Sequence, residues 1–257
     1  MDEDHSSSRR IMLLAIAIAA VITMLFLERI PQDPAYHSFA DSREIATLPN
    51  FANICSNLLF LFVGLYGLQR RPLLRKPETR PGYTALSLGI LCIGLGSVHY
   101  HWAPSTPALF WDRLPMSITF MALFSLLLEE RVFPTASSKT LWPLLAMGIG
   151  SAAYWHWSEA QGLGDLRPYA LVQFLPMALI PAILLLFPAK YLHSERLWAG
   201  LALYTLAKLC ELFDREILAA STMVSGHTLK HLLSGLAALC MLLAVPVRER
   251  TRKRRRG

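Results

Sequence analysis

Long apolar blocks separated by short polar joints dominate the sequence. A run of roughly 17–25 apolar residues is long enough to cross a bilayer as an α-helix, and such runs recur along the whole chain. We predict eight of these helices, at residues 11–27, 51–69, 83–101, 113–129, 141–156, 169–187, 197–213 and 227–246. Joints rich in Pro, Gly and charged residues separate them. The predicted fold class is therefore all-α, a polytopic transmembrane helix bundle without a separate soluble domain.

Composition supports this interpretation. Hydrophobic residues make up 54% of the chain and charged residues only 17%, whereas a soluble domain normally carries about 25% charge. The four cysteines stand singly inside apolar blocks, so we expect them to pack as small hydrophobic residues. Arg9 and Arg10 precede the first block, as in a signal peptide, but no small-residue cleavage site follows. We therefore expect a retained first helix.

The net charge of +7 does not indicate nucleic-acid binding, because seven of the cations lie in a short tail at residues 248–256. Such a tail fixes orientation and can touch anionic lipid. With eight helices, the joints on the side of the two termini hold 18 Lys and Arg residues and the opposite side holds five. Basic residues favour the cytoplasmic side, so both termini are predicted to be cytoplasmic.

Five chemically active side chains fall at one membrane level in this topology. The third block ends with Ser97 and His101, the fourth begins near Asp112, and the eighth begins with His227 and His231. Ionisable groups inside a membrane are costly and usually functional. Because the topology was derived from Lys and Arg alone, their coincidence on the non-cytoplasmic side is independent support for one shared site.

The spacing of the histidines points to zinc. His227 and His231 are four residues apart, so they share one helix face, and His101 could supply a third nitrogen. Three histidines leave a fourth position for water, which is typical of a catalytic zinc site. Asp112 could then act on that water and Ser97 could stabilise the oxyanion. Asp112 could also serve as the N-terminal cap of the fourth helix.

Other polar residues have a simpler explanation. An isolated His-x3-His pair is common at a helix end, so the third histidine and the carboxylate decide in favour of a metal. We expect His99 and Lys230 to face away from the histidines, Lys230 extending toward the interface. On the second helix, Asn50, Asn53 and Asn57 form one stripe, which we expect to point into the bundle because amides rarely face lipid. The residues expected to line the cavity or to support the site through hydrogen bonds and ion pairs are Asn53, Ser56, Asn57, Lys208 and Glu211.

At this point four motifs in order resemble the alkaline ceramidase family, part of the CREST superfamily of membrane hydrolases. They are Asn53-Ile-Cys-Ser-Asn57, Ser97-x3-His101, Asp112-Arg-Leu-Pro-Met116 and His227-x3-His231. The resemblance covers residues 48–246 and implies a seven-helix catalytic core there. Residues 1–47 would then be a cytoplasmic N-terminus, an extra transmembrane helix and an outer loop, and residues 247–257 a basic cytoplasmic tail.

The resemblance implies that His101, His227 and His231 bind Zn²⁺, that Asp112 acts on the zinc-bound water and that Ser97 stabilises the oxyanion. The implied reaction is hydrolysis of the N-acyl bond of a ceramide-like membrane lipid to a long-chain base and a fatty acid. Eukaryotic members carry an acidic calcium-binding segment with a glutamate where Asn50 stands here. Residues 37–44 do not reproduce that pattern, so the sequence does not support calcium dependence.

The sequence is closer to the bacterial branch, which implies an inner-membrane protein with its site near the periplasmic face. Two alternatives stay open: a zinc hydrolase of another lipid amide or ester, and a non-enzymatic membrane protein resembling adiponectin receptors. A transporter is disfavoured, because transporters usually place their site at mid-membrane between internal repeats. The sequence gives no information on oligomeric state.

Overall fold

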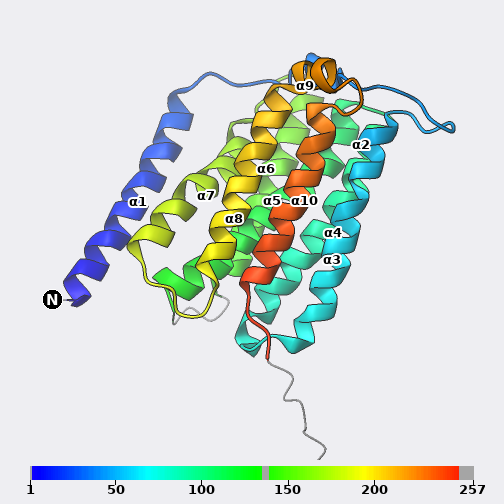
Figure 1. The fold of residues 1–257 in the computed structure, drawn as a ribbon. Helices are drawn as coiled ribbons and strands as arrows, with labels where there is room; N and C mark the ends of the chain where they lie inside the picture. The colour runs from blue at the N-terminus through cyan, green and yellow to red at the C-terminus, as the bar shows by residue number, and fades with distance from the viewer. Residues whose placement is uncertain (1, 135–138, 249–257) are drawn as a thin grey trace, which may run out of the picture.

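The computed structural model describes residues 2–134 and 139–248, so most of the predicted basic tail lies outside the described residues. The described chain is an all-α bundle without β-strands (Figure 1). Its α-helices are α1 (Asp2–Phe26), α2 (Phe51–Ser56), α3 (Leu58–Arg70), α4 (Arg80–Trp102), α5 (Thr106–Leu127), α6 (Leu141–Ala160), α7 (Arg167–Leu186), α8 (Ser194–Leu212), α9 (Asp214–Ser221) and α10 (Gly226–Ala244). Each predicted block corresponds to a long helix, with α2 and α3 together forming the second.

Six segments of the described chain are helical, long and apolar enough to cross a membrane. They contain α1, α2 with α3, α4, α5, α7 and α10. The remaining long helices, α6 and α8, run within the same bundle, and α8 carries four charged residues. The protein is therefore a multi-pass membrane protein, as predicted from its apolar blocks.

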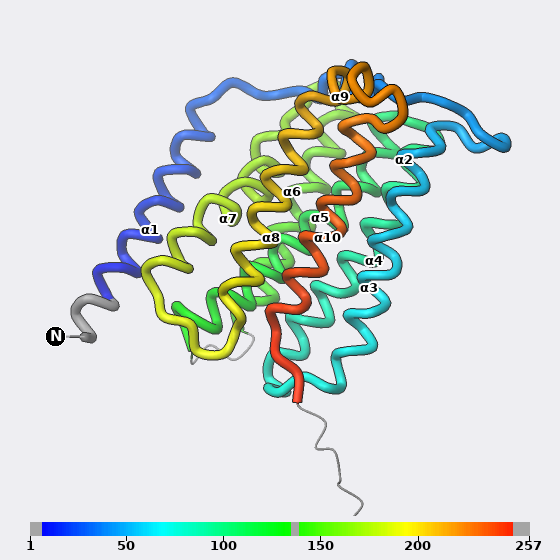
Figure 2. The backbone as a smooth tube through the Cα atoms, viewed as in Figure 1, coloured from blue at the N-terminus to red at the C-terminus, as the bar shows by residue number. Residues whose placement is uncertain are grey.

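Helix α1 stands apart from the rest of the bundle (Figure 1). Only 6% of its apolar stretch is buried within the protein, whereas the other five candidate spans are 44–50% buried. It leans on α7, while α10 runs between α8 and α3 (Figure 2). The helices that carry the candidate site, α4, α5 and α10, thus belong to the packed bundle, and α1 packs only at its periphery.

Three local features differ from the prediction. Helix α5 begins at Thr106 rather than near residue 113, because Ser105 accepts a hydrogen bond from the Ala108 amide and Pro107 fits the first turn. The prediction that Asp112 caps this helix is therefore wrong. The second helix breaks at Asn57, whose side chain donates to the Asn53 carbonyl at 2.7 Å and competes with the helical pattern. The short helix α9 was not predicted.

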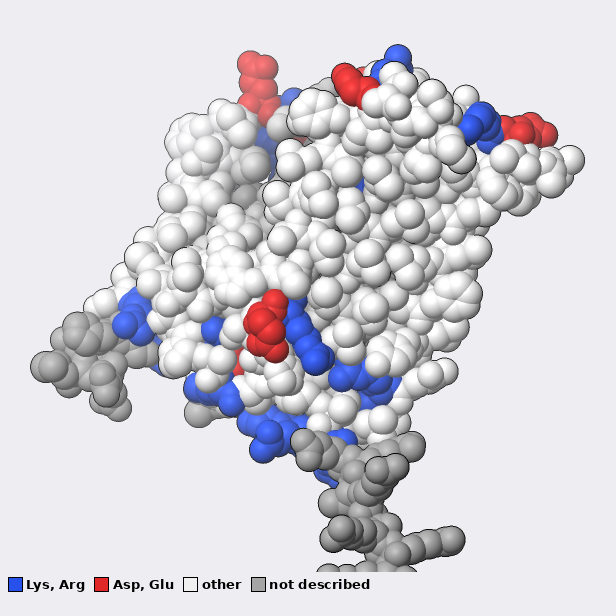
Figure 3. All heavy atoms as spheres, viewed as in Figure 1, with Lys and Arg blue, Asp and Glu red and all other residues white. Residues whose placement is uncertain are grey.

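Basic residues gather at one end of the bundle, where α1 begins and α10 ends, in the face shown in Figure 3. Helix α9 and the N-terminus of α10 lie at the opposite end (Figure 1). This distribution matches the Lys and Arg asymmetry of the joints in the sequence. The histidines at the start of α10 therefore lie far from the basic end.

Helices α4 and α5 approach so closely at Gly96 that no larger residue fits. A Cβ atom built at Gly96 would overlap the Trp111 carbonyl oxygen, whereas one built at Gly150 on α6 would meet nothing within 4 Å. Gly96 and Trp111 precede Ser97 and Asp112, so this contact sets the distance between the two candidate catalytic residues.

We expect Gly96→Ala to destabilise the protein by about 1–3 kcal/mol or more, because overpacking forces the helices apart. Gly150→Ala is the matched control, with the same added methyl group in open space, and should keep or slightly raise thermal stability in detergent, because alanine favours a helix more than glycine does. Thermal unfolding followed by size-exclusion chromatography measures both. Equal stability of the two variants would contradict the close packing of α4 on α5.

Candidate metal centre and active-site cavity

Three histidines from two helices meet at the end of the bundle that carries α9. His101 lies in the last turn of α4, and His227 and His231 lie in the first two turns of α10. One ligand nitrogen from each lies within 4.8 Å of the others, and all three side chains are buried. The predicted histidine set is thus brought together from positions more than 120 residues apart in the chain.

Their spacing suits a tetrahedral metal ion. The Nε2 atoms of His101 and His227 are 3.4 Å apart. Two nitrogens bound at 2.0–2.1 Å to a tetrahedral zinc ion lie about 3.3–3.4 Å from each other. Nδ1 of His101 is buried without a hydrogen-bond partner. These residues therefore fit a metal ion such as zinc.

Helix α2 and its junction with α3 orient His231. The Ser56 hydroxyl donates to the Asn53 carbonyl at 2.9 Å and lies 2.9 Å from His231 Nδ1. A Ser56 hydroxyl that donates to the carbonyl can accept from Nδ1–H of His231. That tautomer leaves Nε2 of His231 free to bind a metal. The amide of Asn57 also lies close, 3.2 Å from the same Nδ1 atom.

We expect Ser56→Ala to weaken zinc binding 10–100-fold, the usual cost of removing a partner that orients a metal-binding histidine. The measurement is competition with a chromophoric chelator. Ser151→Ala is the control, because Ser151 is also buried and donates to a backbone carbonyl, but on α6. An unchanged zinc affinity in Ser56→Ala would show that this hydrogen bond does not orient the ring.

Buried asparagines tie the histidine-bearing helices together. Asn50 donates to the His101 carbonyl at 2.9 Å. Asn53 accepts from the Thr228 hydroxyl at 2.9 Å and donates to the Asp41 carbonyl at 3.3 Å. Each asparagine is largely or fully buried, which confirms the prediction that this polar stripe points into the bundle. Their amides hold α4, α10 and the outer loop at fixed distances around the histidines.

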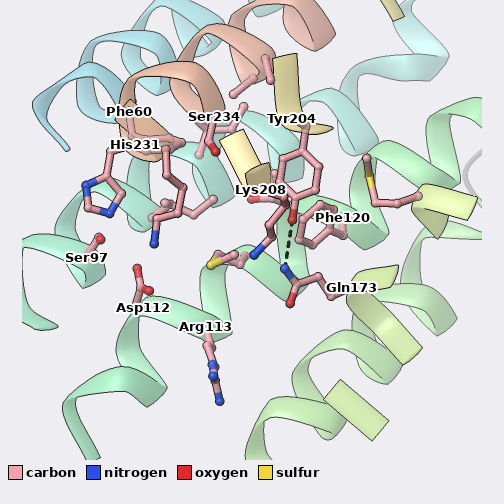
Figure 4. A pocket seen from close by; sticks show the side chains of 18 of the residues that line it. Phe60, Ser97, Asp112, Arg113, Phe120, Gln173, Tyr204, Lys208, His231 and Ser234 are labelled. Atoms are coloured by element: carbon pink, nitrogen blue, oxygen red, sulfur yellow. Dashed lines mark hydrogen bonds between the residues drawn. The ribbon is translucent and has the colours of Figure 1, made fainter. Parts of the chain in front are cut away.

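Ser97 and Asp112 lie beside the histidines. Ser97 is on α4, one turn before His101, and Asp112 is in the second turn of α5. Their oxygens point toward each other at the edge of the space that His231 faces (Figure 4). Both side chains line the same cavity as His231. A hydroxyl donor and a carboxylate thus flank the space in front of the histidines.

Two lysines share one carboxylate in the same region. Lys208 and Glu211 form the predicted ion pair on α8, with Nζ and Oε2 2.7 Å apart. Lys230 was expected to face away from the histidines, and that expectation is wrong. Its Nζ lies 3.0 Å from Glu211 Oε1 and 3.0 Å from His227 Nε2. The flexible stem of lysine bends around the helix toward the buried carboxylate, which compensates its charge.

A cavity of about 340 Å³ opens from this polar cluster. Ser97, Asp112, His231 and the two lysines line one part of it. Apolar side chains line the rest, including Leu86, Ile90, Leu123, Ala237 and Met241. Met241 follows His231 by about 15 Å along α10, so the cavity runs deep into the bundle. One end of the cavity, called here the polar head, is therefore lined by polar side chains, and the remainder is apolar.

The cavity also has a neighbour on the lipid-facing side. A groove between α7 and α8 shares four lining residues with it, Phe174, Met177, Tyr204 and Lys208. Gln173 donates to the Tyr204 hydroxyl at 2.9 Å beside this junction (Figure 4). The groove thus adjoins the wall opposite the histidines.

Comparison with known families identifies the chain. The family model described as Ceramidase matches residues 37–256. The chain belongs to the Ceramidase family. The match covers α2 to α10 and leaves out α1. Comparisons with curated proteins and with solved structures give no match. Membership of the Ceramidase family makes the protein a ceramidase-like hydrolase that acts on amide bonds, and it implies a lipid substrate.

The sequence did not reveal two contacts to the histidines, one from the outer loop at residues 27–50, which covers the site, and one from α9. The Phe39 ring packs against His101 and His227, with centroid distances of 4.5 and 4.7 Å. Asp214, the first residue of α9, accepts hydrogen bonds from the Ala40 and His227 amides at 3.0 and 2.7 Å. Neither residue follows a helical repeat with the histidines, so spacing alone could not reveal them.

Electrostatics in this loop favour a fixed arrangement. A side-chain hydrogen bond from Arg43 lowers the pKa of Asp41 below its ordinary value. Burial, with a contribution from the Arg113 charge, lowers the pKa of His37. His37 is therefore neutral at physiological pH, where its ring bridges the hydroxyls of Tyr100 and Thr106 at 2.9 and 3.1 Å. These bonds anchor the loop to α4 and α5 next to the histidines.

Proposed function

We propose that this protein is an integral-membrane, zinc-dependent hydrolase of the N-acyl amide bond in ceramide-like lipids, releasing a long-chain base and a fatty acid. The observation that carries the proposal is a cluster of three buried histidines, one of which, His231, lines the polar head of an apolar cavity together with Asp112 and Ser97. In a member of the Ceramidase family, that combination matches the needs of lipid amide hydrolysis.

The three histidines would hold the zinc ion, and Ser56 would keep the ring of His231 in the required tautomer. When bound, zinc supplies Lewis acidity and makes an activated water available near neutral pH. The protein supplies the orientation of the ligands and a site largely closed to bulk water. Phe39 covers two of the rings and contributes to that closure.

Asp112 and Ser97 would carry the proton transfer and the charge stabilisation. Asp112 accepts a proton from the attacking water and delivers it to the amine nitrogen as the C–N bond breaks. Ser97 donates a hydrogen bond to the carbonyl oxygen as negative charge develops there. The hydroxyl of one residue and the carboxylate of the other face each other (Figure 4), so both can reach a single scissile amide.

The apolar part of the cavity would hold the acyl chain. Its lining by Leu, Ile and Met side chains favours hydrocarbon, and its depth of about 15 Å suits an extended chain. The groove between α7 and α8 offers a path by which a lipid could enter from the bilayer. A lipid could thereby keep its chains in an apolar environment while its amide reaches the histidines.

The test is zinc analysis with an amide-turnover assay. We expect purified protein in lipid nanodiscs to bind about one zinc per chain, to hydrolyse ceramide, to lose activity with a strong chelator and to recover it with added zinc. Lipid esters and other N-acyl lipids are assayed in parallel. Fully zinc-loaded, folded protein that hydrolyses none of the amides would refute the proposed reaction.

We further propose that the termini are cytoplasmic and that the site faces the periplasm of a bacterial inner membrane. The gathering of Lys and Arg at the end opposite the histidines supports this orientation (Figure 3). Alkaline phosphatase fused to the C-terminus should be inactive and green fluorescent protein fused there should fluoresce. The reverse pattern would invert the orientation.

A further inference from the structure

The wall of the cavity facing the histidines carries more positive charge than its carboxylates balance. Lys208 and Lys230 both pair with Glu211, at 2.7 and 3.0 Å, and Glu211 also accepts from the Tyr36 hydroxyl at 3.3 Å. One carboxylate therefore serves two ammonium groups. Both lysines line the cavity, and the side chain of Lys230 is only 15% exposed.

Arg113 adds a third cation to the lining. It packs over the Trp155 and Tyr169 rings at 4.4 and 5.1 Å, and its Nη1 atom is buried without a hydrogen-bond partner. The cavity lining thus holds three cations and two carboxylates, Glu211 and Asp112, before any metal ion adds its own charge. Excess charge inside a membrane protein is costly, and such residues usually mark a binding site.

The two lysines lie at the polar head of the cavity, next to the proposed reaction site. Lys230 reaches His227 directly, at 3.0 Å. Lys208 lies beside Tyr204 and Gln173 on the same cavity (Figure 4), and Glu211 links it to Lys230. A group bound by these lysines would therefore lie close to the scissile amide and far from the apolar end that suits the acyl chain.

Ceramide offers only neutral hydroxyl groups on the nitrogen side of its amide, so it leaves the extra charge unmatched. A carboxylate on the carbon next to the amide nitrogen would match it, since an ammonium group is a strong point-charge partner for a carboxylate. We propose that the preferred substrates are N-acyl amino-acid lipids, whose carboxylate pairs with Lys208 and Lys230 while water cleaves the amide to a fatty acid and an amino acid. This inference rests on the proposed zinc amidase function and replaces the long-chain base of the preferred substrate by an amino acid.

The test compares two substrates that differ at one group. N-palmitoylserine and N-palmitoylserinol share the acyl chain and the amide, but the first has a carboxylate where the second has a hydroxymethyl group. We expect zinc-loaded protein in phosphatidylcholine nanodiscs to favour the serine compound in kcat/KM about ten-fold or more, the discrimination expected for a charge-assisted hydrogen bond.

Variants locate the source of that preference. Lys208→Met should reduce the ratio of kcat/KM for the serine compound to that for the serinol compound toward one. Lys208→Arg, which keeps the positive charge, should retain most of that ratio. Lys190→Met removes an equal charge from an exposed position at the opposite end of the bundle and should not change it. The ratio of two substrates on one enzyme sample is insensitive to how much of each variant folds.

The outcomes separate this inference from the proposed function. Hydrolysis of ceramide or the serinol compound at least as fast as the serine compound overturns the inference and leaves the amidase in place. If none of the three is cleaved, the amidase proposal fails, and ligand-induced thermal shifts then decide the anion site. Equal thermal shifts by N-palmitoylserine and N-palmitoylserinol would overturn the proposed carboxylate site. A Lys208→Met variant that relieves inhibition by palmitate without changing the substrate ratio would assign the lysines to the released fatty acid instead.

Discussion

Replacing His101 by alanine should abolish both metal binding and amide turnover. His101 is the one ligand candidate from α4, and its Nε2 lies 3.4 Å from that of His227, the separation of two nitrogens on one ion. Loss of a ligand should weaken zinc binding by more than the 10–100-fold typical of losing an outer partner. We expect less than about one tenth of a zinc per chain after purification, and activity at background.

The matched control is His99→Ala. His99 lies on the same helix but is exposed, as expected from its angle to His101. It should keep full zinc content and turnover, so any general effect of removing an imidazole from α4 is accounted for. Measurement is by elemental analysis of both variants, with thermal unfolding to establish that each is folded. Full zinc occupancy in folded His101→Ala would exclude this histidine set as the metal site.

Much of the fold was predictable because a membrane imposes simple rules on sequence. Each apolar block became a helix, and the buried asparagine stripe followed from helical spacing and the cost of placing amides in lipid. The histidines could be grouped because the Lys and Arg asymmetry placed the ends of the helices that carry them on one side. These inferences depend only on position along a helix and on which end faces which side.

The remaining features depend on tertiary contacts that spacing does not encode. The prediction for Lys230 was wrong because position along a helix fixes only the direction of the Cα–Cβ bond. The long side chain then turns toward Glu211 on a neighbouring helix. Phe39 and Asp214 reach the histidines from a loop and from the short helix α9. The start of α5 was missed because the apolar run was taken to begin at residue 113, although Ser105 and Pro107 form a helix start seven residues earlier.

Asp112→Asn tests the proposed proton transfer most directly. The amide has nearly the same shape as the carboxylate, but it cannot accept a proton from water at neutral pH. We expect turnover per zinc-loaded protein to fall about 10²–10⁴-fold, the usual contribution of a positioned acid–base group. Zinc content should stay near that of the unmodified protein, because Asp112 is not among the three clustered ligands.

The control and the pH profile distinguish catalysis from general charge effects. Asp33→Asn removes the same charge from an exposed loop on the same side of the bundle and should leave turnover unchanged. If Asp112 is the base, the residual activity of Asp112→Asn should also lose the acidic limb that a carboxylate base gives to kcat/KM. Undiminished turnover in a folded, zinc-loaded Asp112→Asn protein would show that Asp112 does not transfer the proton in this reaction.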